Sequence, residues 1–160
     1  MKRVNLILQN DEYKSRVARI EELEVDRKFC RHGMDHFLDV ARIAVLMAKD
    51  EGIDAGRDII YAAALLHDIG RPEQYEDGVE HELASAAVAP FILEECGYSE
   101  AETQEIVTAI INHGNEAVKN ENSLTGLLYR ADKASRKCYM CKAIDECHKS
   151  PEKRVMEIKY

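Results

Sequence analysis

Apolar residues recur along this chain at intervals of three and four, the spacing that places them on one face of an α-helix. In the segment 10–24, Tyr13 and Val17 belong to such a stripe, and Asn10 stands where a helix cap would be. The segment 56–67 is apolar on nearly every side, which indicates a helix in the middle of the domain. Together these blocks predict helices over 10–24, 32–51, 56–67, 80–96, 99–114 and 123–136.

Glycine, proline and serine mark the expected helix ends. Gly52 is a natural C-terminal cap, and Ser99 with Glu102 three residues later has the spacing of a capping box. The polar segment 73–79 is read as a loop, and Pro90 should start a new turn or kink its helix. We therefore predict an all-α fold, a single-domain bundle of five or more helices around a buried metal site.

Length and charge narrow the class of protein. A chain of 160 residues is long enough for one domain with its own core. Its 22 basic and 30 acidic residues give a net charge of −8, which disfavours a long nucleic-acid partner or an anionic membrane. No stretch approaches the roughly 20 apolar residues of a membrane span, and the N-terminus does not resemble a signal peptide. We expect a soluble, cytoplasmic protein, and the oligomeric state stays open.

The positions of certain histidines and aspartates suggest a metal site. His67 and Asp68 end the most apolar helix, where an unpaired buried carboxylate would cost several kcal/mol unless a cation compensates it. His36 lies on the inner face of its helix, and Asp132 follows a buried stripe. Each residue alone also fits a helix cap or a solvated side chain, but several at apolar helix ends make coincidence less plausible. Imidazole with carboxylate suits Mn, Fe, Co, Ni or Zn.

The order H…HD…D, with the tetrapeptide HDIG at 67–70 and Asp132 in YRADK, resembles the HD-domain superfamily of metal-dependent phosphohydrolases. The resemblance covers roughly 32–136. It implies an all-helical fold around a central divalent metal, whose ligands would be His36, His67, Asp68 and Asp132. The chain then divides into an N-terminal helix packing on the core, the HD metal-binding core and a cysteine-rich tail, at 1–31, 32–136 and 137–160.

A second metal is an open question at this point. His81 opens the fourth expected helix and His113 closes the fifth, where extra ligands fall in the dinuclear subgroup that includes the symmetrical dinucleoside tetraphosphatases. The alternatives are a surface histidine at a helix start and a C-terminal cap. His32, four residues before His36, could support the site, face the substrate or lie in solvent.

The resemblance implies a metal-dependent phosphohydrolase acting on a nucleotide or another small phosphate ester through a metal-activated water. Asp68 could hold the metal and orient that water, while Arg71 could grip a phosphate where many relatives carry Lys. Lys133 is a weaker candidate for the same role, and both cations could simply be solvated. Two other functions stay possible: a di-iron oxygenase of the HD type, and a non-catalytic metal-containing module that senses a nucleotide.

Cysteines gather in the tail as C-x2-C-x5-C, formed by Cys138, Cys141 and Cys147. This spacing is familiar from zinc and iron–sulfur sites but lacks a fourth ligand. If the helices of His36 and Asp132 are antiparallel, Cys30 would meet Cys138 at one end of the bundle and complete a structural site. His148 could replace Cys30, and the alternative is four reduced thiols without metal.

Overall fold

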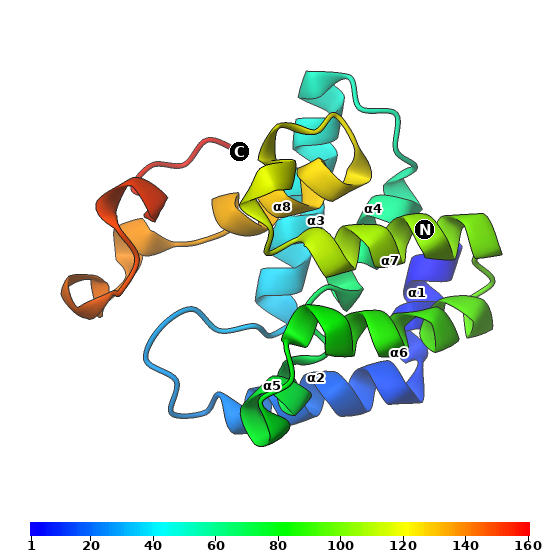
Figure 1. Ribbon diagram of the computed structural model, residues 1–160, viewed down its shortest axis with the longest axis horizontal. Helices are drawn as coiled ribbons and strands as arrows, with labels where there is room; N and C mark the ends of the chain where they lie inside the picture. The colour runs from blue at the N-terminus through cyan, green and yellow to red at the C-terminus, as the bar shows by residue number, and fades with distance from the viewer.

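The computed structural model describes all residues 1–160 as one helical bundle without strands, which confirms the predicted all-α, single-domain fold (Figure 1). One short 3-10 turn follows α7, and three more lie in the C-terminal tail. The α-helices are α1 (Lys2–Gln9), α2 (Asp11–Leu23), α3 (Met34–Glu51), α4 (Arg57–Leu66), α5 (Arg71–Asp77), α6 (His81–Glu95), α7 (Glu100–Asn112) and α8 (Leu124–Ala134), and the 3-10 turns are η1 (Glu116–Asn120), η2 (Cys138–Met140), η3 (Ile144–Glu146) and η4 (Pro151–Lys153).

The apolar helix α4 occupies the centre, as its all-round apolar pattern predicted. It packs against α1, α3, α6, α7 and α8, and every residue from Ala62 to Leu66 is buried. Its run of alanines leaves little side chain between neighbouring helices, so they approach the end of α4 closely. That end carries His67 and Asp68, which are therefore buried together with it.

The helix α1 was not among the predicted helices, because an eight-residue stretch is too short to show a clear helical period, although half of its residues are apolar. Tertiary contacts hold it instead: Val4 and Ile7 are buried in the core. The guanidinium of Arg3 donates hydrogen bonds to Asp58 on α4 and to Glu102 on α7. These ion pairs tie the N-terminus to two elements far away in sequence.

The prediction of a loop over 73–79 is wrong for most of its length, because residues 73–77 belong to the helix α5. Pro72 lies in the first turn of that helix, where its fixed φ angle and missing N–H favour a start rather than a stop. Gly78 ends the helix with a φ of 73°. The other proline in question, Pro90, lies inside α6, which continues through it.

The predicted caps are found where the sequence placed them. The side chain of Asn10 accepts a hydrogen bond from the backbone N–H of Tyr13, and Ser99 with Glu102 forms the capping box at the start of α7. The helix α3 begins at Met34 instead of residue 32. None of the helices combines the length and the apolar character needed to cross a bilayer.

The C-terminal tail lies at one side of the bundle, drawn in orange and red in Figure 1. It contacts the irregular segment 24–33 that joins α2 to α3: Lys28 pairs with Glu146, and the rings of Phe29 and His148 pack edge to face with centroids 6.0 Å apart. The tail contributes few buried residues of its own, among them Cys138. The tail is therefore held in place by contacts with other segments and not by a core of its own.

Candidate metal centre

The carboxylate of Asp68 is the centre of the candidate site. The residue follows the end of α4 and is only 1% exposed. Its Oδ2 atom lies 3.4 Å from Nε2 of His67 and 3.6 Å from Nε2 of His36. Its Oδ1 atom lies 3.1 Å from Nε2 of His81 and 3.6 Å from Nε2 of His113. The two oxygens of one buried carboxylate thus face two different histidine pairs.

Each histidine pair forms, with Asp68, a group of three whose ligand atoms all lie within 4.8 Å of one another. Within each pair, His36 with His67 and His81 with His113, the two Nε2 atoms are 3.2 Å apart. Two nitrogens bound to the same ion at about 2.0–2.1 Å would lie roughly 3 Å from each other. The donor atoms and their spacing therefore suit a divalent transition metal in each group.

Four helices bring these side chains together from distant parts of the chain. His36 lies in the first turn of α3, His81 is the first residue of α6, and His113 caps the end of α7. Gly70 allows the start of α6 to come this close to the HDIG segment. A Cβ atom at Gly70 would lie 2.3 Å from the backbone nitrogen of Ser85, which is far inside contact distance.

The imidazole rings are oriented by hydrogen bonds to their far nitrogens. Nδ1 of His67 lies 2.7 Å from the backbone carbonyl of Ala64, and Nδ1 of His113 lies 2.7 Å from that of Ile110. A carbonyl only accepts, so each Nδ1 carries the proton and each Nε2 presents its lone pair. Two lone pairs facing each other at 3.2 Å repel unless a cation or a proton lies between them.

His36 is held in the same way by a side chain. The hydroxyl of Ser135 donates to the backbone carbonyl of Asp132 at 2.8 Å, and its oxygen lies 3.3 Å from Nδ1 of His36. Because the Ser135 hydroxyl donates its proton to Asp132, its oxygen acts as the acceptor for the N–H at Nδ1 of His36. Such outer hydrogen bonds are a regular feature of metal-ligating histidines.

Asp132 lies beside the first group without belonging to it. Its Oδ1 atom is 3.5 Å from Nε2 of His36, but the set within 4.8 Å includes only His36, His67 and Asp68. Its other oxygen lies 2.5 Å from Nζ of Lys133, which also donates to the backbone carbonyl of His113. Lys133 is therefore engaged at the site and is not simply a solvated cation.

Arg71 and His32 approach the same carboxylate from the outer side. The guanidinium of Arg71 lies 3.0 Å from Oδ1 of Asp68 and also donates to Gln74. His32 is 8% exposed, and its Nε2 atom is 3.9 Å from Oδ2 of Asp68. Its Nδ1 atom lies 2.6 Å from Glu24, so this ring too is fixed by a carboxylate behind it.

The protonation states match those that metal ligands require. Burial lowers the pKa of His67 to about 3, although Asp68 acts in the opposite direction. Burial alone would raise the pKa of Asp68, but His67 and Arg71 outweigh it and hold that pKa well below its usual range. The pKa of Asp132 is also lowered, against burial, chiefly by Lys133. Neutral imidazole and ionised carboxylate are the ligand forms.

His81 differs from the other histidines in its titration. Burial would lower its pKa, but hydrogen bonding to Asp68 and Glu82 outweighs burial and raises it. The Glu82 carboxylate lies 3.0 Å from Nδ1 of His81 on the side away from Asp68. Metal binding by His81 would therefore have to displace a proton, which makes the second group the more pH-sensitive of the two.

The cysteines do not form a comparable group. No set of three with ligand atoms within 4.8 Å includes a cysteine. Burial raises the pKa of Cys30, Arg136 acts in the opposite direction, and the nearby Cys138 adds to the rise. The proposed site of Cys30, Cys138, Cys141 and Cys147 stays a prediction. Cys96 is a buried residue at the end of α6.

Sequence reasoning missed the residues that orient the histidines. Glu24 is 3% exposed and accepts hydrogen bonds from His32 and Tyr75. Burial would raise its pKa, but these bonds lower it to about 2. Ser135 and Glu82 were missed as well. Ser135 stands three residues after Asp132, one helical turn away, and this spacing was the only signal available in the sequence.

Comparison with known proteins agrees with the geometry. The HD domain family model matches residues 33–152. An uncharacterized protein of Clostridium beijerinckii is 45% identical over 160 residues, which is 100% of both chains. Ribonuclease Y of Lawsonia intracellularis is 30% identical over 111 residues, and Ribonuclease Y of Acetivibrio thermocellus is 29% identical over 119 residues. No solved structure gives a significant match.

The matches to Ribonuclease Y involve 69% and 74% of this chain but only 19% and 21% of those longer proteins. The family match, by contrast, extends over most of the chain and includes every residue of the two histidine–aspartate groups. The chain therefore belongs to the HD-domain family, whose members are generally metal-dependent hydrolases.

Proposed function

We propose that this member of the HD-domain family is a metal-dependent phosphohydrolase that acts on a nucleotide or another small phosphate ester. The observation that carries the proposal is the buried Asp68 carboxylate, whose two oxygens each face a pair of histidine nitrogens. We assign one divalent metal to His36, His67, Asp68 and Asp132. We assign a second to Asp68, His81 and His113.

The metal would supply the reactive water and offset negative charge on the phosphate. The chain's own residues would orient the water and the metal-binding imidazoles. Asp68 would accept a hydrogen bond from the attacking water, because it is ionised and fixed in place. The outer hydrogen bonds at Nδ1 keep the imidazoles neutral and correctly turned.

Two cations are placed to bind the phosphate. Arg71 lies beside Oδ1 of Asp68 with 16% of its side chain exposed, so part of its planar fork is open to a ligand. Lys133 lies next to Asp132 and is 29% exposed. A phosphate bound between Arg71 and Lys133 would offer its oxygens to these cations in place of the carboxylates of Asp68 and Asp132. His32, held by Glu24, would face the same ligand.

Elemental analysis of the purified protein tests the proposal first, with the His67→Ala, Asp68→Ala double variant as control. We expect about two equivalents of transition metal in the wild type and their loss in the variant. Metal-loaded wild type should then hydrolyse a simple nucleotide or aryl phosphate, and the variant should not. Equal metal content in both proteins would refute the assignment.

The same shared carboxylate would also suit a di-iron oxygenase, so the measurement must separate the two enzymes. Iron as the native metal, with oxygen consumption and no phosphate release, would favour the oxygenase. Metal without either activity, together with nucleotide binding, would favour a sensing module. Arg71 beside Asp68 favours the phosphohydrolase, because an oxygenase site has no need for a cation there.

A further inference from the structure

A large pocket lies next to the metal centre and not within it. This cavity has a volume of about 1150 Å³, is partly open to solvent and is lined by α3, α8 and the C-terminal tail. None of the histidines or aspartates of the two groups lines it, but three of their neighbours do. Gly114 follows His113, while Lys133 contacts Asp132. The third, Ser135, holds the ring of His36.

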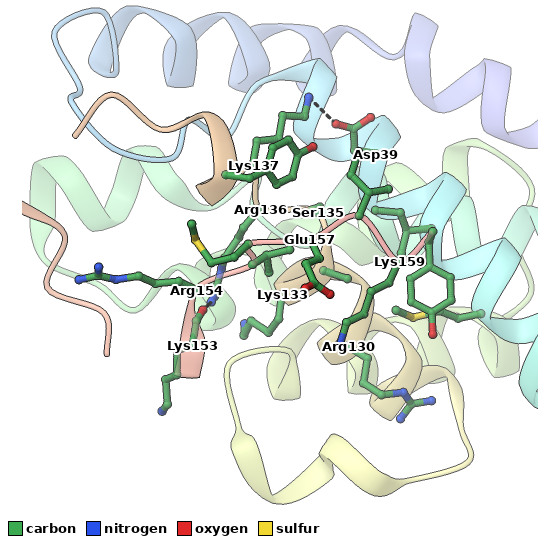
Figure 2. A pocket seen from close by; sticks show the side chains of 18 of the residues that line it. Asp39, Arg130, Lys133, Ser135, Arg136, Lys137, Lys153, Arg154, Glu157 and Lys159 are labelled. Carbon is green, nitrogen blue, oxygen red and sulfur yellow. Dashed lines mark hydrogen bonds and ion pairs between the residues drawn. The ribbon is translucent and has the colours of Figure 1, made fainter. Parts of the chain in front are cut away.

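The cavity is basic although the protein is acidic. Nine basic and four acidic residues line it, against 22 basic and 30 acidic residues in the whole chain. Figure 2 shows the basic side chains of α8 and of the tail gathered around this space, with Glu157 among them. A local excess of positive charge on a molecule of the opposite sign marks a place for an anion.

Most of these cations are not neutralised by the protein itself. Four of the nine pair with carboxylates: Arg130 with Glu51, Lys133 with Asp132, Lys137 with Asp39 and Lys153 with Glu116. Five others form no ion pair with a carboxylate, and these are Arg42, Arg136, Lys149, Arg154 and Lys159. The crowding is visible in the titration of Lys149: burial, and then the charge of Arg136, lower the pKa of its ammonium.

The rest of the lining suits an aromatic ring. Tyr129, Tyr139 and Tyr160 line the cavity together with apolar side chains such as Ile43 and Met156. Tyrosines interleaved with cations are the surface that binds nucleobases by stacking and phosphates by charge. The volume is at or above the upper end of the usual range for small-molecule sites, so a whole nucleotide fits.

We propose that this cavity is the binding site for a nucleotide carrying two or more phosphates, with its base among the tyrosines and its phosphate chain directed along Lys133 towards the metal centre. The inference rests on the proposed phosphohydrolase function and names its substrate class. Lys133 and Ser135 lie between the cavity and the metal centre, because each lines the cavity and contacts a residue of the metal centre.

Direct titration with ATP tests the site without requiring catalysis. Metal-free wild type should still bind ATP, because the cations and tyrosines that line the cavity belong to neither histidine–aspartate group. The Arg42→Gln, Arg136→Gln variant should bind it at least about tenfold more weakly, since a single hydrogen bond to a charged group is worth that much. The Lys49→Gln, Arg57→Gln variant, with the same change of charge outside the cavity, should bind it as the wild type does.

Other ligands and the enzymatic assay separate the remaining outcomes. Adenosine and tripolyphosphate should each bind more weakly than ATP, because each lacks half of the contacts. ATP binding that is unchanged in the Arg42→Gln, Arg136→Gln variant, or a short single-stranded RNA that binds more tightly than ATP, would overturn the proposal. If ATP fails to bind while the metal-loaded wild type hydrolyses an aryl phosphate, this inference fails and the proposed function stands.

Discussion

Replacement of Gly70 by alanine should damage the metal centre through the backbone, without removing a single ligand. An added Cβ would lie 2.3 Å from the backbone nitrogen of Ser85, and 2.6 Å from both the Cβ of Ala84 and the carbonyl oxygen of His81. Ordinary contacts begin near 3.4 Å. The first turn of α6 would therefore have to move outward by about 1 Å. That turn carries His81, whose Nε2 lies 3.1 Å from Asp68.

The expected cost can be worked from two contributions. Overpacking of a tight contact costs about 1–3 kcal/mol. The movement also weakens the buried hydrogen bond from the Gly70 N–H to the Ser85 hydroxyl, now 2.9 Å long, which is worth about 1 kcal/mol. We expect Gly70→Ala to lower the free energy of unfolding by about 2–4 kcal/mol. The second metal, held by His81 and His113, should be lost before the first.

Urea unfolding followed by circular dichroism, together with metal analysis, measures both effects. The control is Gly78→Ala, since an added Cβ there meets nothing within 4 Å while the φ of 73° still strains an alanine. That strain should cost about 1–2 kcal/mol and leave the metal content unchanged. A Gly70→Ala protein with wild-type stability and full metal content would refute the reasoning from close approach.

Three further changes have expected outcomes. Ser135→Ala removes the acceptor at Nδ1 of His36 and should weaken binding of the first metal about 10–100-fold in a competition titration against a chelator, while Ser135→Thr should retain most of it. Glu102, whose pKa is lowered to about 2 chiefly by its arginine partner, contributes stability above about pH 4.5 that is lost as the pH falls towards 2. Glu102→Gln should therefore unfold with less dependence on pH over that window, an effect of about 1 kcal/mol or less because the pair is partly exposed. The Cys138→Ala, Cys141→Ala variant should lose any metal in excess of that held by the histidine groups, and an unchanged total metal content would refute the cysteine site.

Much of this protein could be determined from its sequence alone. Helix periodicity and local caps depend on residues three or four apart, so the central helix α4 and the capping box of α7 were readable in the chain. The HDIG segment was informative for the same reason, since a buried Asp68 at the end of an apolar helix requires compensation by a cation. These signals are local, so they can be recognised in the sequence without knowledge of the fold.

Other features depended on contacts between distant residues. The helix α1 exists because the core accepts Val4 and Ile7, and α5 exists because Pro72 begins a helix here rather than ending one. The pairing of His81 with His113 depends on how α6 packs on α7. No spacing in the chain revealed that Glu24 would hold His32, eight residues away across an irregular segment.

The basic cavity is the clearest product of tertiary structure. Eight of its nine cations lie in 130–160, where nine basic residues stand among five acidic ones, and the ninth, Arg42, comes from α3. A net charge sums over the whole surface, whereas a ligand responds to the charges within about a Debye length, which is roughly 10 Å. Composition therefore described an acidic protein, and only the packing of the tail against α3 and α8 assembled a place for an anion.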